Sequence, residues 1–214
     1  SVGKAHDGRG LEFIWDIPGK RIRHVSISAL IIVIHQVVFQ GMFFAKNISL
    51  GRRLGMPIRG RNREAILSIG FVGLFILFSV VLGLLDAPIG TVAVLTRSAA
   101  LAIALALLAV NLFVGAASLI GLRDSWRVGV LEDQHTDLVE GGMYRFSRNP
   151  YVLSCLIMFA GYVVLLQNVI LFILWLVGFA FFHAMVLREE RHLTALHGEK
   201  YRQYKKRVPR YLIF

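Results

Sequence analysis

Three short stretches near the end of the chain carry the side chains that could do chemistry. In the first, residues 141–151, Asn149 suits the N-cap of a helix and Pro150 suits its first position. A helix N-terminus beside Arg148 offers backbone N–H groups and a guanidinium to the same anion. The stretch therefore predicts a capped helix whose start can also serve as an anion site.

The second stretch follows the last apolar run and combines acidic and basic residues. Glu189 and Glu190 stand where the negative pole of a helix disfavours acids, and Arg188 and Arg191 are the nearest compensating charges. His183 and Glu190 are seven residues apart, so they fall on one helix face. We expect this face to look into a pocket rather than toward lipid.

The third stretch, residues 196–210, predicts a helix stop at Gly198 and then a short basic and aromatic helix that ends before Pro209. An interfacial anchor, with Tyr, Lys and Arg at headgroup depth, would explain this composition without any chemistry.

Other kinds of site fail on spacing. Glu189-x-x-His192 matches one half of a di-iron site, but the sequence has no second Glu-x-x-His. There is no zinc-protease motif, no Gly-x-Ser-x-Gly and no glycine-rich phosphate loop. Cys155 is the single cysteine, so neither an intrachain disulfide nor a paired-cysteine metal site is possible. We expect no metal site.

The elements that must position these stretches are membrane helices. The 214 residues are 56% hydrophobic and only 17% charged, against about a quarter charged in a soluble domain. The apolar residues form runs of roughly 20, the length that spans a hydrocarbon core. The sequence therefore predicts an all-α multi-pass membrane protein with about five transmembrane helices, at residues 24–45, 65–85, 92–122, 151–166 and 169–187.

The last two runs are joined only by Gln167 and Asn168, which predicts a tight helical hairpin. We divide the chain into residues 1–123, a polar segment with three helices, and residues 124–214, a loop, the hairpin and the C-terminal elements. Within the spans, His35, Gln36 and Asn111 are expected to form hydrogen bonds between helices.

The net charge of +11 does not indicate a nucleic-acid partner, because the basic residues flank apolar runs. They indicate anchoring and attraction to membrane lipids. The positive-inside rule places the three chemical stretches and the C-terminus in the cytoplasm and the N-terminus outside. Lys20, Arg21 and Arg23 disagree with this orientation, but four other connections support it.

Together the three stretches resemble the isoprenylcysteine carboxyl methyltransferase family and its phospholipid methyltransferase relatives. The resemblance covers roughly residues 119–212, with Trp126 similar to a family tryptophan. Val152 and Ser154 depart from the family's tyrosine and glycine. The matching motifs are Gly142-x-Tyr144, Arg148-Asn149-Pro150, Glu189-Glu190-x-x-Leu193, Gly198-x-x-Tyr201-x-x-Tyr204 and Val208-Pro209.

The resemblance implies methyl transfer from S-adenosylmethionine to a lipophilic acceptor that enters from the bilayer. That acceptor could be a prenylcysteine carboxylate, a phospholipid or another small lipophilic molecule. Arg148 and the helix start suit the carboxylate of the cofactor, and Glu189 or Glu190 suits its ammonium or hydroxyls. The implied cofactor-binding residues are Tyr144, Arg148, Asn149, Pro150, Tyr151, His183, Glu189, Glu190, Tyr201 and Tyr204.

The implied catalytic residues are Arg148, Glu190 and Arg202, and either Arg202 or Arg207 would hold an anionic acceptor. Methyl transfer to an ionised acceptor needs alignment and charge placement more than a strong base. Two alternatives stay open: an NADPH-dependent membrane reductase related to the sterol reductases, and a non-catalytic lipid-binding membrane protein. The sequence leaves the oligomeric state undetermined.

Overall fold

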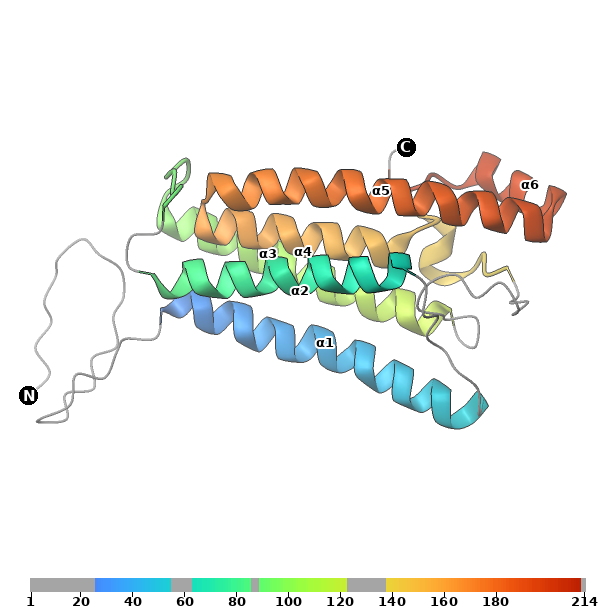
Figure 1. The fold of residues 1–214 in the computed structure, drawn as a ribbon, viewed down its shortest axis with the longest axis horizontal. Helices are drawn as coiled ribbons and strands as arrows, with labels where there is room; N and C mark the ends of the chain where they lie inside the picture. The colour runs from blue at the N-terminus through green and yellow to red at the C-terminus, as the bar shows by residue number, and fades with distance from the viewer. Residues whose placement is uncertain (1–25, 55–62, 86–88, 123–137, 213–214) are drawn as a thin grey trace, which may run out of the picture.

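The computed structural model describes residues 26–54, 63–85, 89–122 and 138–212, and these residues form helices joined by turns. Within them the only β pairing is an isolated bridge between Thr91 and Asn168. The elements, in chain order, are α1 (Ile27–Leu54), α2 (Arg63–Leu84), α3 (Arg97–Gly121), the 3-10 helix η2 (Gly142–Arg145), α4 (Pro150–Leu166), α5 (Val169–His197) and α6 (Glu199–Arg207) (Figure 1).

Five of these helices pack into one bundle, and four of them could span a membrane. α1, α2, α3 and α5 are long and apolar enough to cross a membrane, whereas α4 is apolar but has only 17 residues. A 17-residue helix is about 25 Å long, slightly less than a hydrocarbon core of about 30 Å. α4 contacts each of the other four helices, so its surface is covered by protein. The expected all-α multi-pass membrane fold is confirmed, with four long helices around a shorter central one.

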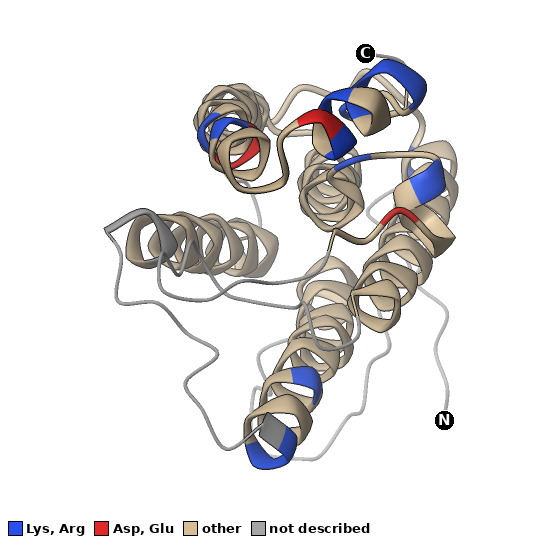
Figure 2. Cartoon of the chain, turned by 90° about the vertical axis from the view of Figure 1, so that its right-hand side faces the viewer, with Lys and Arg blue, Asp and Glu red and all other residues tan. Residues whose placement is uncertain are grey.

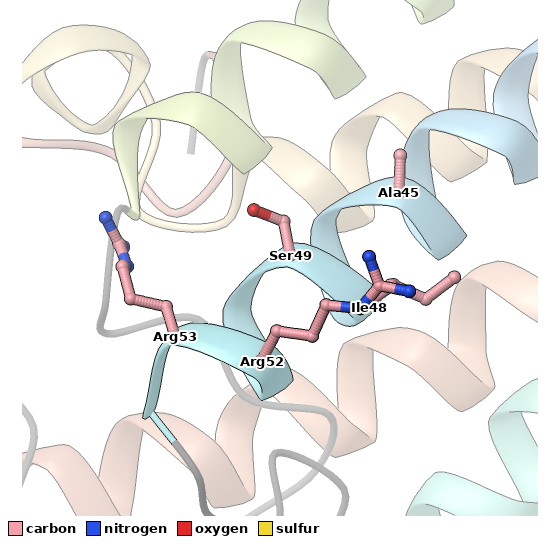
Figure 3. Close-up of a pocket in the computed structure, with 5 residues that line it drawn as sticks. All are labelled: Ala45, Ile48, Ser49, Arg52 and Arg53. Atoms are coloured by element: carbon pink, nitrogen blue, oxygen red, sulfur yellow. The ribbon is translucent and has the colours of Figure 1, made fainter.

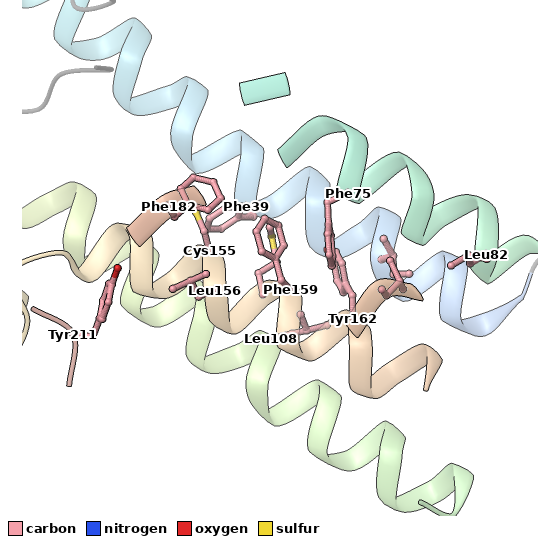
Figure 4. Close-up of a cluster of buried hydrophobic side chains, with 13 residues drawn as sticks. Phe39, Phe75, Leu82, Leu108, Cys155, Leu156, Phe159, Tyr162, Phe182 and Tyr211 are labelled. Atoms are coloured by element: carbon pink, nitrogen blue, oxygen red, sulfur yellow. The ribbon is translucent and has the colours of Figure 1, made fainter. Parts of the chain in front are cut away.

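Aromatic and small residues build the core between α2, α4 and α5 (Figure 4). The rings of Phe75 and Phe159 lie 4.2 Å apart between centroids. A side chain on Gly178 would approach the ring of Phe71 to 2.7 Å. The helices therefore pack closely because a small residue faces a large one, which is how membrane helices associate without a hydrophobic driving force.

A network of buried polar side chains connects α1, α3 and α4, as expected for His35, Gln36 and Asn111. The Asn111 amide donates to the Ser154 carbonyl at 2.7 Å, so its oxygen accepts from His35 Nε2 at 2.9 Å. The other ring nitrogen, Nδ1, then accepts from the Tyr162 hydroxyl at 2.8 Å. Gln36 donates to the same hydroxyl oxygen at 2.6 Å. One histidine tautomer satisfies the whole network, which matters because lipid offers no hydrogen bonds.

Two helix ends differ from the sequence expectation because of tertiary contacts. α1 continues past residue 45 to Leu54, and Leu50 is buried against Leu119 of α3. α3 begins at Arg97 rather than residue 92, and Thr96 caps it. The preceding residues instead bind the turn between α4 and α5: the Val92 N–H donates to the Gln167 carbonyl, and the Gln167 side chain accepts from the N–H groups of Val94 and Leu95.

The chemical stretches all lie at one end of the bundle. α5 does not stop at Leu187 but continues without a break to His197, where Gly198 ends it with a φ of +56°. η2, the start of α4 and α6 lie around this extension (Figure 1). Viewed from this end, Lys and Arg positions lie on α5, α6, the η2 region and the end of α1 (Figure 2).

The polar network predicts a stability effect. Replacing Asn111 by Leu leaves His35 Nε2 and the Ser154 carbonyl without this partner, so we expect unfolding to become easier by about 1 kcal/mol. Ser118→Ala is the matched control on α3, because the Ser118 hydroxyl donates only within its own helix, to Val114. Thermal unfolding in detergent measures both, and equal stability of the two variants would argue against a connecting role for the network.

Candidate functional site

The centre of the site is the buried carboxylate of Glu190, which is 3% exposed on the extension of α5. Arg210 forms a bidentate pair with it: Nε donates to Oε1 and Nη2 donates to Oε2, both at 3.0 Å. Arg148 Nη1 lies 3.0 Å from Oε1, and Lys205 Nζ lies 4.0 Å from Oε2. Bidentate guanidinium–carboxylate pairs are the strong form of charged hydrogen bond. We call Arg148, Glu190, Lys205 and Arg210 the Glu190 cluster.

The Glu190 cluster joins four segments that are distant in sequence. Arg148 precedes α4, Glu190 lies on α5, Lys205 on α6, and Arg210 follows α6. This arrangement explains how a carboxylate is tolerated near a helix C-terminus, where the dipole alone disfavours it. A charge cluster thus connects the membrane hairpin to the C-terminal elements.

Residues 208–211, which we call the C-terminal strap, run across the start of α4. The Arg148 N–H donates to the Pro209 carbonyl at 3.0 Å. The Arg210 carbonyl accepts from the Ser147 hydroxyl at 3.1 Å and from the Asn149 amide at 3.4 Å. The strap therefore binds the Arg-Asn-Pro motif through its backbone and Glu190 through the Arg210 side chain.

The charges of the Glu190 cluster do not cancel. Three cations surround one carboxylate, which leaves an excess of positive charge in a largely buried position. Arg148 is 7% exposed; its Nη1 pairs with Glu190, and its buried Nε makes no hydrogen bond within the part of the chain that the structure describes. A buried guanidinium with unused donors is suited to an additional anion.

A cavity of about 400 Å³ opens beside the cluster. Arg188 and Arg191 add two further cations to its wall, and Ala184 and Leu187 of α5 give it an apolar side. The remaining lining residues are Glu190, Lys205 and Arg210. The cavity can accept an anionic group at one side and an apolar group at the other.

Three tyrosines fix α6 and η2 in place next to the cluster. Tyr144, Tyr201 and Tyr204 are buried, and the Tyr204 hydroxyl donates to the Tyr144 carbonyl at 2.7 Å. Burial raises the pKa of Tyr201 above its ordinary value, and the neighbouring Glu190 carboxylate raises it further. Burial likewise raises the pKa of Tyr204. All three phenols stay neutral, and in this conformation their rings are part of the packing.

The structure brings several of the expected site residues together. Arg148 and Glu190 meet in the cluster, and Tyr201 lies beside both. Pro150 is at the start of α4 as expected. Asn149 occupies the N-cap position, but its side chain makes no cap hydrogen bond and binds the C-terminal strap instead.

The face shared by His183 and Glu190 was expected to look into a pocket, and the C-terminal strap covers much of it. Tyr211 lies against His183, with the hydroxyl 3.4 Å from Nδ1, while Arg210 covers Glu190. Only the Glu190 end of this face borders the cavity. Two turns of one helix thus serve as the docking surface of the strap.

Other expected residues lie apart from the cluster. Arg202 is 62% exposed and pairs with Glu199 on the same helix. Arg207 is also exposed and pairs with Glu140 at 2.7 Å. Glu189 is exposed although Glu190 is buried, since adjacent residues on a helix point in different directions. Tyr151 turns away from the cluster and stacks on Phe39 of α1.

Sequence reasoning missed Arg210 and Lys205 as members of the site. The signal was present, because a carboxylate near a helix C-terminus needs cations, but Arg188 and Arg191 were the nearer candidates in sequence. The departure at Ser154 from the family motif lies in the bundle, where its hydroxyl donates to the Tyr151 carbonyl. Trp126 and the expected boundary after residue 123 lie outside the described residues.

Comparison with known proteins gives one family match, and the matched residues include part of the site. Residues 99–200 match the model of the phospholipid methyltransferase family. A search of curated proteins found no significant match. The matched region runs from α3 into the start of α6 and contains Arg148 and Glu190, while Lys205 and Arg210 follow it. Through residues 99–200, just under half of the chain, this protein is therefore similar to the phospholipid methyltransferase family, the relatives that its motifs resembled, and the match supports a membrane methyltransferase in general.

Proposed function

We propose that this protein transfers a methyl group from S-adenosylmethionine to a lipophilic acceptor at the cytoplasmic membrane surface. The observation that carries the proposal is the Glu190 cluster, in which the family's Arg-Asn-Pro and Glu-Glu motifs meet beside a basic cavity at the end of a membrane hairpin. A cofactor with a carboxylate, and an acceptor with an apolar tail, each find matching chemistry there.

The residues fit the anionic part of the cofactor. Its carboxylate would be held by Arg148, whose buried Nε has no hydrogen-bond partner among the described residues, and by the excess positive charge of the cluster. Both Glu190 oxygens are already bound by guanidinium groups. Glu190 therefore serves to hold Arg148 and Arg210, and exposed Glu189 is the better candidate for the ammonium or ribose hydroxyls.

The chemistry required of the protein is binding and alignment. When bound, S-adenosylmethionine supplies a methyl group activated on a sulfonium sulfur. Glu190 is not suited to act as a base toward the acceptor, because guanidinium groups already occupy both of its carboxylate oxygens. We infer that the Glu190 cluster orients the reactants and balances charge, and that the acceptor reacts in a form that is already nucleophilic.

An acceptor can reach the cavity from the bilayer along α5. Ile173, Leu176 and Val177 are exposed on its membrane-spanning part, and Leu187 lines the cavity itself. The family name points to a phospholipid as acceptor. The cytoplasmic location is supported by the Lys and Arg positions at this end of the bundle (Figure 2).

Cofactor binding is the first prediction. We expect the detergent-solubilised protein to bind S-adenosylhomocysteine in a calorimetric titration and not to bind NADPH, which separates a methyltransferase from a reductase. Arg148→Ala should weaken binding more than tenfold, because it removes the buried guanidinium whose Nε is free to bind the cofactor carboxylate. The charge-matched control is Arg97→Ala, because Arg97 is exposed at the start of α3, at the end of the bundle away from the Glu190 cluster. Equal affinity of the two variants would remove Arg148 from the site.

The acceptor class gives a second prediction. With methyl-labelled S-adenosylmethionine and a membrane lipid extract, we expect label to enter the organic phase and to comigrate with a phospholipid. A protein that binds S-adenosylhomocysteine but labels only a prenylcysteine analogue would contradict the phospholipid assignment. One that binds S-adenosylhomocysteine and labels neither would contradict methyl transfer to these acceptors.

The C-terminal strap gives a third prediction. Arg210→Ala should lower the free energy of unfolding by about 1.5 to 3 kcal/mol, since it removes two charged hydrogen bonds to buried Glu190. Arg202→Ala should change stability little, because exposed ion pairs contribute little. Denaturant or thermal unfolding measures both variants. Arg210→Lys should recover only part of the loss, as lysine cannot form the bidentate contact.

A further inference from the structure

A second basic site lies on α1, on a helix that contributes nothing to the Glu190 cluster. α1 contains no Asp or Glu, and its lysine and arginine residues are Lys46, Arg52 and Arg53, all within its last nine residues. The candidate membrane span on this helix runs from Ile27 to Arg53, so the two arginines lie at one end of the span. This is the depth at which lipid headgroups meet a membrane helix.

A cavity of about 520 Å³ lies against the final turns of α1. Figure 3 shows the Arg52 guanidinium lying beside Ile48, with the Ser49 hydroxyl and the Arg53 side chain on the other side of the helix end. Ala45 completes the lining. The site thus combines two guanidinium groups and one hydroxyl with a small apolar wall.

The surroundings of this cavity are those of a lipid-facing surface. Ile48 is 53% exposed one turn before Arg52, and Phe44 is 56% exposed two turns before it. An exposed apolar stripe that ends in arginines matches a lipid, with acyl chains beside Phe44 and Ile48 and a headgroup at Arg52. A soluble anion would use the guanidinium groups but would gain nothing from the apolar stripe.

We propose that the end of α1 is a binding site for an anionic phospholipid. Arg52, which lies beside Ile48, binds the phosphate, and Arg53, on the other side of the helix end, adds to the positive charge that attracts the headgroup. An acyl chain lies along Ala45, Ile48 and Phe44. The lipid binds outside the Glu190 cluster, and the inference does not depend on the proposed methyl transfer.

The test compares lipid binding to the full-length protein in detergent by native mass spectrometry, with phosphatidylglycerol and phosphatidylcholine as the probes. We expect the wild type to prefer phosphatidylglycerol. Arg52→Gln combined with Arg53→Gln should weaken phosphatidylglycerol binding by about tenfold or more, since each basic residue near the surface contributes on the order of 1 kcal/mol. Ser49→Leu, which fills the cavity without changing charge, should also weaken it.

The matched control is the double variant Lys200→Gln with Lys206→Gln, which removes the same charge from the exposed face of α6. It should leave phosphatidylglycerol binding within about twofold of wild type, and thermal unfolding should show that all variants fold. Equal losses in the two double variants, or no preference for phosphatidylglycerol in the wild type, would overturn the proposal. Displacement of the lipid by an equal concentration of inorganic phosphate would show a free-anion site instead and would also overturn it.

Discussion

Burying the carboxylate of Glu190 requires cations to replace its lost water, and this requirement organises the functional end of the molecule. Arg210 and Arg148 make contacts of 3.0 Å with it, and they come from opposite sides of the membrane hairpin in sequence. The start of α4, the extension of α5 and the C-terminal strap are thereby held together. Because each segment contributes a charged side chain to this contact, the segments form one unit.

The bundle supports this unit by keeping its own polar groups satisfied. His35, Asn111 and Tyr162 connect three helices through hydrogen bonds that lipid could not replace. Phenylalanine rings and glycines fill the space around α4. The central helix can therefore be short, because protein rather than lipid surrounds it, and its first residues emerge beside the cluster.

Positive charge serves several purposes at this end of the molecule. In the Glu190 cluster three cations surround one carboxylate, and the excess positive charge suits a bound anion. On α1 it ends an apolar, lipid-exposed stripe and has no acidic residue on the same helix. We therefore propose that the basic residues serve one buried site for a reactant and one exposed site for a lipid, and the two can be tested independently.

The sequence by itself determined the helical class of the protein and indicated the family that residues 99–200 match. Apolar runs predicted the membrane helices, Pro150 and Gly198 marked helix ends, and the spaced motifs indicated a methyltransferase region. Only the tertiary structure decided which charges meet. Spacing places Glu189 and Glu190 on different faces of α5 but does not say which face is covered, and the covering strap brings Arg210 to Glu190 across 20 residues. Which arginine reaches Glu190 depends on how the helices and the strap pack, and spacing along the sequence does not give this. For that reason the sequence analysis expected Arg202 at the site, whereas the structure places Arg210 there.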